Sequence, residues 1–409
     1  MELMYTRCAG LDVHQKTVVA CARVVDEGKV SEELRTFDTT TSGLLALSAW
    51  LEEKGCTHVA MEATGVYWKP VWHVLEPTFE LLLANAAHIK NVPGRKTDVK
   101  DATWIADLLA HGLIRGSFVP PTPVQDLRAL MRTRKQLVRE VARNTQRLQK
   151  ALEDANIKLT GVVSDVLGKS GRAILDALVA GETDPERLVD LAGGRLKTPR
   201  AELVEALRGH VRDHHRFLLK LHLEQIDGLK KAVRDLEARV GEQLDPFRKN
   251  VELLTTIPGI SETAARVMVS EFGADMSRFP TSGHLVSWAG FCPRCDESAG
   301  KRRSSRIRHG APWLKTTLIQ CAWAAVRAKD SYLRAQFHRL KSRVGAMKAI
   351  VAVAASMLTA TYHMLTSGQE YRELTGSYFD KRDSTKLAKR LVKRLETLGL
   401  KVTVTAPAA

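Results

Sequence analysis

Four carboxylates in the first quarter of the chain are spaced so that they can bind a metal ion. Asp12 lies in the apolar run "GLDVH", and Glu62 lies at the end of another, "AMEATG". Asp98 and Asp101 follow in "KTDVKDA", three residues apart, so they share one face if this segment is helical. Carboxylates this close repel each other unless a cation lies between them. The four acids predict a site for Mg²⁺, or alternatively Mn²⁺, which can activate an oxygen for attack on a phosphate.

A second candidate site is the stretch "CDESAGKRRSSRIRHG" (295–310). Ser298 lies there beside the small residues Ala299 and Gly300, which allow the close backbone approach that a phosphate needs. A serine hydroxyl is a poor nucleophile without a base or a metal, and Asp296 and Glu297 are candidates to help. Five basic residues that can neutralise a phosphoryl-transfer transition state lie in the eight positions 301–308, namely Lys301, Arg302, Arg303, Arg306 and Arg308.

Both sites also have simpler interpretations. Asp98 and Asp101 are acids of the kind that the helix dipole favours in a first turn. Asp296 and Glu297 fit solvated side chains, and the whole 295–310 stretch fits an exposed basic loop. The elements that position these residues therefore matter.

Residues 1–120 alternate strand and helix patterns. β-Branched runs predict strands at 8–14, 17–25, 32–40, 57–63 and 79–85, and helical spacing predicts helices at 42–55, 66–76 and 96–112. This order of elements fits a mixed-sheet α/β domain. We expect it to bring the four acids together at one end of the sheet.

Two apolar seams, 127–159 and 219–244, advance by three and four residues alternately. They predict two long helices in an antiparallel coiled-coil hairpin, with a helical cap between them. The first helix has eight basic residues between positions 128 and 150 and one acid, Glu140. This basic face is either a solvated surface or a contact with nucleic-acid phosphates, made by residues such as Arg132, Arg139 and Arg143.

The segment from 251 predicts a mainly helical domain. Its "IPGIS" turn resembles a helix-hairpin-helix element, in which Pro258 and Gly259 present backbone N–H groups to a phosphate. The apolar run 349–365 is shorter than the roughly 20 residues of a membrane span and predicts a buried helix. A basic tail follows from residue 371.

The composition of the 409 residues is that of a soluble globular protein, with 44% hydrophobic and 26% charged residues. A formal net charge of +16 indicates a polyanionic partner, most often nucleic acid. Six cysteines do not make a disulfide scaffold, and the "CPRC" pair has no second pair to complete a zinc site. The N-terminus has no signal-peptide pattern, so we expect a cytoplasmic protein with no membrane partner.

The residues around the acids and the serine resemble two signatures of one family. Asp12 on the first strand, "MEATG" and "KTDVKDA" are similar to the RuvC-like (RNase H-like) domain of DEDD transposases. These belong to the insertion-sequence family numbered one hundred and ten, to which the pilin-gene DNA invertase is related. "TTIPGISETAARVMVSEFG" and "SAGKRRSSRIRHGAPWLKTTLIQCAW" are similar to its second signature. The resemblance implies four parts: a RuvC-like DEDD metal-binding domain (1–120), a coiled-coil spacer (121–250), a transposase domain with the serine (251–370) and a basic tail (371–409).

What the resemblance implies for function is specific. Ser298 stands where the family has its nucleophilic serine, and the metal-binding acids are Asp12, Glu62, Asp98 and Asp101. The family is understood to cut and rejoin DNA through a covalent phosphoserine. Its active site combines the metal domain of one subunit with the serine domain of another, which requires a dimer, and a tetramer when two DNAs are held in synapsis. A bridge RNA encoded by the element pairs with donor and target DNA.

The sequence departs from the family at one place. Where the family usually has two glycines after the serine, this chain has Ala299 and Gly300. Because alanine disfavours a left-handed backbone, we expect no left-handed residue at position 299. Ser304 and Ser305 are alternative nucleophiles, but Lys301 follows Ser298 at the family's spacing.

Two other functions remain open. A Mg²⁺-dependent, structure-selective endonuclease of the Holliday-junction type would use the four acids and leave no covalent adduct. A non-catalytic nucleic-acid-binding scaffold would tolerate Asp12→Asn in binding and catalyse no strand transfer.

Overall fold

The computed structural model describes residues 3–63, 65–85, 89, 101–193, 198–293, 296–304, 306–382 and 384–404. The contacts divide the chain into two compact units, residues 1–119 and 120–409. The predicted division of the second unit into spacer, transposase domain and tail stays a prediction.

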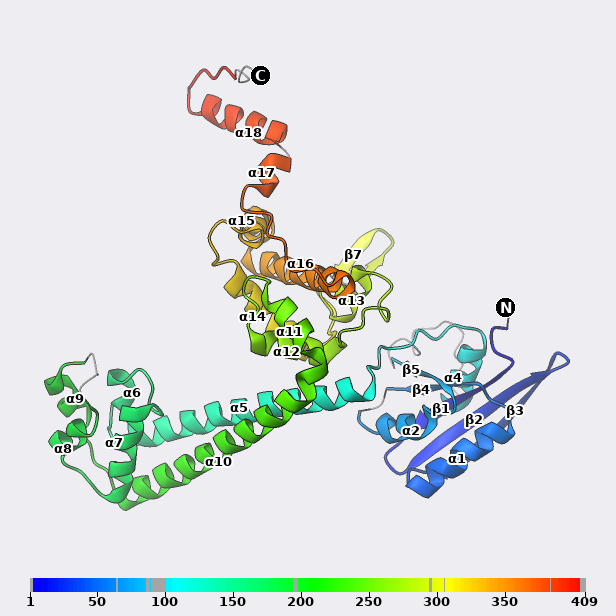
Figure 1. Cartoon of the computed structure of the whole chain (residues 1–409), viewed down its shortest axis with the longest axis horizontal. Helices are drawn as coiled ribbons and strands as arrows, with labels where there is room; N and C mark the ends of the chain where they lie inside the picture. Colours follow the sequence, from blue (N-terminus) through cyan, green and yellow to red (C-terminus); the bar gives the residue numbers. More distant parts are fainter. Residues whose placement is uncertain are drawn as a thin grey trace. The chain divides into compact units, whose positions relative to one another are not determined.

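The first unit is built on a mixed five-stranded sheet with the order β3-β2-β1-β4-β5 (Figure 1). Strands β1, β2 and β3 are antiparallel neighbours, whereas β1, β4 and β5 run parallel. The strands are β1 (Arg7–Val13), β2 (Thr17–Asp26), β3 (Lys29–Asp38), β4 (His58–Glu62) and β5 (Glu80–Ala84).

Helices cover both faces of this sheet because its strands are apolar on both sides. Leu11, Val59 and Met61 pack on one face against α1 (Thr41–Glu53) and α2 (Trp68–Leu75). Cys8 and Ala60 pack on the other face against α4 (Asp101–Ala110). Successive side chains of a strand point to opposite faces, so this alternation also fixes where the polar residues point.

The second unit begins with two long helices, α5 (Thr122–Asp154) and α10 (Asp213–Leu244), which pack along each other (Figure 1). Leu148, Leu152, Leu219 and Leu223 are buried between them and the helical cap. The cap consists of α6 (Leu159–Val162), α7 (Lys169–Ala180), α8 (Pro185–Asp190) and α9 (Arg200–Ala206).

The rest of the second unit is a helical bundle with one small hairpin. The apolar helix α16 (Ala346–Ser367) is its core element. It is the only described helix long and apolar enough to cross a membrane by length and composition, but its buried side packs against four neighbouring helices. Its companions are η1 (Asp245–Phe247), α11 (Arg248–Thr255), α12 (Glu262–Phe272), α13 (Ser282–Trp288), β6 (Asp296–Ser298), β7 (Lys301–Ser304), α14 (Pro312–Ala325), α15 (Tyr332–Val344), α17 (Tyr378–Arg382) and α18 (Ser384–Thr397).

The structure confirms a mixed α/β domain followed by helices, which agrees with the predicted RuvC-like fold and helical C-terminal part. The coiled-coil and helix-hairpin-helix assignments stay predictions. Val138 lies within the predicted seam 127–159 but is 43% exposed, and Arg134 of the same segment is ion-paired with Glu237 of α10.

Candidate functional site

Asp12 and Glu62 lie side by side at one edge of the first unit's sheet. The last matched pair of the parallel strands β1 and β4 is Leu11 with Met61, so Asp12 and Glu62 are the next residues on each strand. Leu11 and Met61 both belong to the core on the α1 and α2 face. Because side chains alternate along a strand, Asp12 and Glu62 both point to the face that α4 covers.

Helix α4 brings Asp101 to the same edge. The Sγ atom of Cys8 is 3.7 Å from the carbonyl oxygen of Ala106, while Gly10 lies against Ala102 and Ala106. Strand β1 therefore runs along α4 towards the N-terminus of the helix. Asp12 follows Gly10 in this direction, and Asp101 is the first residue of α4. The close approach requires glycine at position 10, since a Cβ there would collide with the backbone of α4.

The donor chemistry at this edge fits a hard divalent cation such as Mg²⁺ or Mn²⁺, because the donors are carboxylate oxygens. His14, which the sequence did not single out, places its Nε2 atom 3.1 Å from the carboxylate of Asp12. Among the residues that the structure describes, no three His, Cys, Asp or Glu side chains are grouped to hold a metal ion. Asp98, the fourth predicted ligand, lies outside the described residues.

The serine stretch forms a β-hairpin rather than an open loop. β6 and β7 are antiparallel, and Ser298 pairs with Lys301 across a two-residue turn. Ala299 has a φ angle of 50° and Gly300 a φ angle of 72°, so both turn residues are left-handed. Our expectation for Ala299 was wrong: two-residue hairpin turns whose twist matches that of the strands need positive φ at both positions, and the alanine adopts it at some cost.

The base of this hairpin is fixed by backbone contacts. Pro293 and Ile307 form an isolated bridge, and Gly310 packs against Ala289 and Gly290 so closely that a Cβ would not fit. Lys315 of α14 donates to the carbonyl oxygens of Arg308 and His309, at 2.5 and 2.7 Å. These contacts hold the hairpin between the ends of α13 and α14.

The predicted cations around Ser298 are only partly described. Lys301, Arg306 and Arg308 are exposed, and Arg308 Nη1 lies 3.5 Å from Ser287 Oγ. For Ser298, Asp296, Arg302 and Arg303 the structure describes the backbone alone, and Ser305 lies outside it. The roles of these residues stay predictions.

The basic residues of the predicted face of α5 have different partners. Arg132 donates two hydrogen bonds to Glu271 of α12, at 2.8 and 2.7 Å, and Arg143 pairs with Glu140 on its own helix. Arg139 instead lies 5.3 Å from the ring centroid of Trp313.

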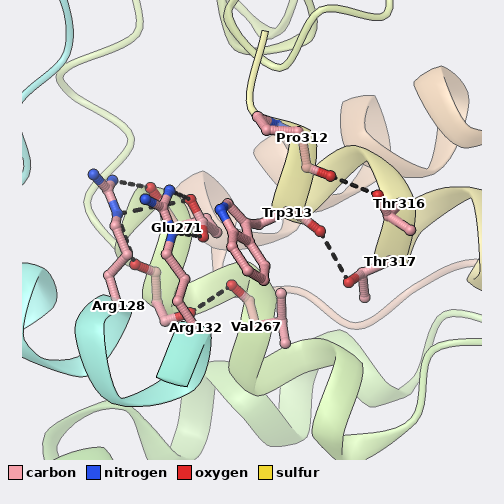
Figure 2. Close-up of polar contacts among 9 residues, drawn as sticks. Arg128, Arg132, Val267, Glu271, Pro312, Trp313, Thr316 and Thr317 are labelled. Carbon is pink, nitrogen blue, oxygen red and sulfur yellow. Dashed lines mark hydrogen bonds and ion pairs between the residues drawn. The ribbon is translucent and has the colours of Figure 1, made fainter. Parts of the chain in front are cut away.

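Glu271 is the buried centre of this contact region, and the sequence analysis missed it. Its side chain is 2% exposed and is also within 3.7 Å of Arg128, which donates to the backbone carbonyls of Ser270 and Glu271. Burial lowers the pKa of Arg128 to about 10. Figure 2 shows Arg128, Arg132 and Trp313 gathered around Glu271. The available signal was an acid in the C-terminal, apolar half of "ETAARVMVSEFG", nine residues after the first-turn acid Glu262.

The Pro-Gly turn packs against another helix. Gly259 has a φ angle of 84°, and a Cβ there would lie 2.5 Å from backbone atoms of Cys321 and Ala325 in α14. Ser261 caps α12 by accepting a hydrogen bond from the N–H of Ala264. The glycine therefore has a packing role, and a phosphate contact by Pro258 and Gly259 stays a prediction.

Comparisons with known proteins match the two candidate regions separately. Residues 9–157 match the model of the DEDD transposases of the IS110 type, described as "Transposase". Residues 251–338 match "Transposase IS116/IS110/IS902 family". The chain is also 26% identical over 301 residues to the "Insertion element IS110 uncharacterized 43.6 kDa protein" of Streptomyces coelicolor, covering 68% of this chain and 73% of that protein.

Proposed function

Because this chain belongs to the IS110 family of transposases, we propose that it cuts and rejoins DNA through a covalent phosphoserine on Ser298. One observation carries the proposal. The two matched segments contain the two candidate sites, the carboxylate edge in residues 9–157 and the serine hairpin in residues 251–338.

In the proposed reaction, Ser298 Oγ attacks the phosphorus of a DNA phosphodiester. The serine proton passes to a nearby carboxylate, for which Asp296 and Glu297 are candidates, and from there to the sugar oxygen, which leaves as a hydroxyl. A sugar hydroxyl of another strand then attacks the phosphoserine and releases the serine. The number of phosphoester bonds is unchanged, so strand transfer needs no ATP.

The acids Asp12, Glu62, Asp98 and Asp101 are proposed to hold the divalent cation, Mg²⁺ or Mn²⁺. The bound ion would supply Lewis-acid polarisation of the phosphate. The cations after Ser298 stabilise the charge that develops on the phosphate oxygens.

We further propose that an RNA from the element selects the DNA sites. The net charge of +16 suits a protein that binds nucleic-acid backbones, while base pairing between guide and DNA supplies the sequence choice. Binding of RNA should then depend steeply on salt. Sequence-specific DNA binding by the RNA-free protein would contradict this part of the proposal.

A trapping assay tests the phosphoserine. The protein is incubated with Mg²⁺, RNA from the flanking region of the element and labelled donor and target DNA, then denatured. We expect label on the protein, lost in Ser298→Ala and in Asp101→Asn, with Ser304→Ala as the matched control that retains it.

The alternatives give different results in the same assay. DNA cleaved without any adduct would favour the metal-dependent endonuclease, and Ser298 would then be an ordinary hairpin residue. Nucleic-acid binding without cleavage would favour the scaffold.

A further inference from the structure

Trp313, near the start of α14, has three cations of α5 around its ring. The centroid of the ring is 5.8 Å from Arg132 Cζ, 5.4 Å from Lys135 Nζ and 5.3 Å from Arg139 Cζ. These cations lie three and four residues apart, so they share one face of the helix. An aromatic ring attracts cations but carries no net charge to neutralise them.

The nearby acid does not compensate all of this charge. Glu271 is shared by Arg132 and Arg128. Within the described part of the chain, Lys135 and Arg139 have no ion pair. Lys135 and Arg139 therefore lie beside one half-buried indole without an ion pair of their own among the described residues, although the charge of Glu271 also acts on Lys135.

Lys135 is the more unusual of the two. Its Nζ atom is buried and has no hydrogen-bond partner among the described residues. Burial, together with the charge of Arg139, lowers the pKa of Lys135. An ammonium group without a hydrogen-bond partner is costly to bury, and an anion in the adjoining space would offset that cost.

A cavity of about 430 Å³ adjoins this lysine. Lys135 lines it from α5, Gly259 and Ser261 line it from the turn before α12, and Thr317 and Gln320 line it from α14. The cavity therefore lies between Lys135 and the Pro-Gly turn, which is predicted to bind phosphate. Its lining from α14 begins at Thr317, one helical turn after Trp313.

We propose that this cavity binds a phosphate of a nucleic-acid strand, with Lys135 and Arg139 balancing its charge and Trp313 contacting the adjoining nucleotide. The inference rests on the proposed function, which identifies the polyanion as nucleic acid. The site that it assigns is separate from the carboxylate edge and from the serine hairpin. The proposal also changes which residues of the basic face of α5 contact nucleic acid. Arg132 is ion-paired with Glu271 and Arg143 with Glu140, so Lys135 and Arg139 take their place.

The test compares Lys135→Met with Lys150→Met, an equal change of charge at an exposed position of the same helix. Binding is measured over a salt series with single-stranded RNA, single-stranded DNA and duplex DNA of one length. For Lys135→Met we expect about tenfold weaker binding, with the slope of log K against log salt smaller by about 1. Lys135→Arg should bind as the wild type does.

Thermal unfolding of the free proteins separates this role from a purely structural one. Removing a buried, unpaired ammonium should leave Lys135→Met at least as stable as the wild type. Lower stability, or binding equal to that of Lys150→Met, would overturn the proposal. Weakening for RNA alone would assign the site to the guide, and weakening for duplex DNA alone would assign it to donor or target.

The trapping assay distinguishes failure of this inference from failure of the proposed function. If wild-type protein forms the adduct but Lys135→Met binds normally, the phosphate site alone is wrong. If wild-type protein forms no adduct but Lys135→Met still binds weakly, the phosphoserine alone is wrong.

Discussion

The two turn residues after Ser298 determine how sharply the chain reverses beside the proposed nucleophile. Ala299 and Gly300 are both left-handed, and a Cβ on Gly300 would meet no atom within 4 Å. An alanine at either position is therefore strained by its positive φ angle, and at position 300 no neighbouring atom would clash with its Cβ. A left-handed residue other than glycine costs roughly 1–2 kcal/mol.

Ala299→Gly should stabilise the protein by about 0.5–1 kcal/mol, and Gly300→Ala should destabilise it by roughly 1 kcal/mol. The reason is that glycine relieves the strain at position 299, whereas alanine introduces it at position 300. Urea unfolding measures both. A destabilised Ala299→Gly variant would contradict the left-handed assignment.

The buried thiols give a pH prediction. Burial raises the pKa of Cys8 to about 12 and that of Cys56 and Cys321 to about 11, from 9.0. The unfolded chain therefore loses these protons first, and their contribution to stability falls as the pH rises from about 9 towards 12. Alkylation followed by mass spectrometry should label these three slowly and the half-buried Cys292 faster. Equal labelling rates in the folded protein would contradict the burial.

At the scale of elements, the packing of α4 on β1 decides whether Asp101 reaches Asp12. Gly10 permits this contact, because a Cβ would collide with the backbone of Ala102 and Ala106. The position of Asp101, one of the proposed metal ligands, thus depends on a residue that has no side chain.

Gly10→Ala should destabilise the first unit by about 1–3 kcal/mol or more, because α4 must move away from the sheet. The matched control is Gly116→Ala, since a Cβ there meets nothing within 4 Å. Urea unfolding gives the stability, and the trapping assay should show a lower adduct yield for Gly10→Ala at limiting Mg²⁺. Equal behaviour of the two variants would contradict the close packing.

The contact of α5 with α12 depends on one buried carboxylate. Glu271→Gln leaves Arg128 and Arg132 without their counter-charge, and the expected loss of stability is about 3–5 kcal/mol. Glu262→Gln on the same helix removes an exposed carboxylate that pairs with Arg266, and should cost about 0–1 kcal/mol. Urea unfolding of the two variants checks this difference, and losses of equal size would show that Glu271 is not a buried centre.

At the scale of the whole molecule, the two candidate sites lie in different units, Asp12, Glu62 and Asp101 in the first and Ser298 in the second. A site shared between subunits makes a clear prediction for mixed oligomers. Ser298→Ala supplies an intact metal half, and Asp101→Asn supplies an intact serine half.

Mixing Ser298→Ala with Asp101→Asn should therefore restore part of the adduct that neither variant forms alone. The measurement is the trapping assay on co-expressed subunits with tags of different mass, so that the label can be assigned to the Asp101→Asn chain. If the mixture stays inactive while each variant still assembles, both halves of the site come from one subunit.

Most of the elements, and the chemical types of the residues at the candidate sites, follow from local patterns in the sequence. Alternating and helical periodicities depend on near neighbours, so strands, long helices and the edge positions of Asp12 and Glu62 could be predicted from them. The run of cations after Ser298 was equally visible.

The partners of individual side chains, by contrast, depend on the tertiary structure. Glu271 is 139 residues from Arg132 in sequence, and no local pattern shows that it pairs with Arg132 while Lys135 has no hydrogen-bond partner among the described residues. The left-handed Ala299 likewise follows from the pairing of β6 with β7, which imposes positive φ on a two-residue turn whatever residue stands there. Burial and pairing arise from segments distant in the chain, so the free energy that selects them has no signature in a short stretch of sequence.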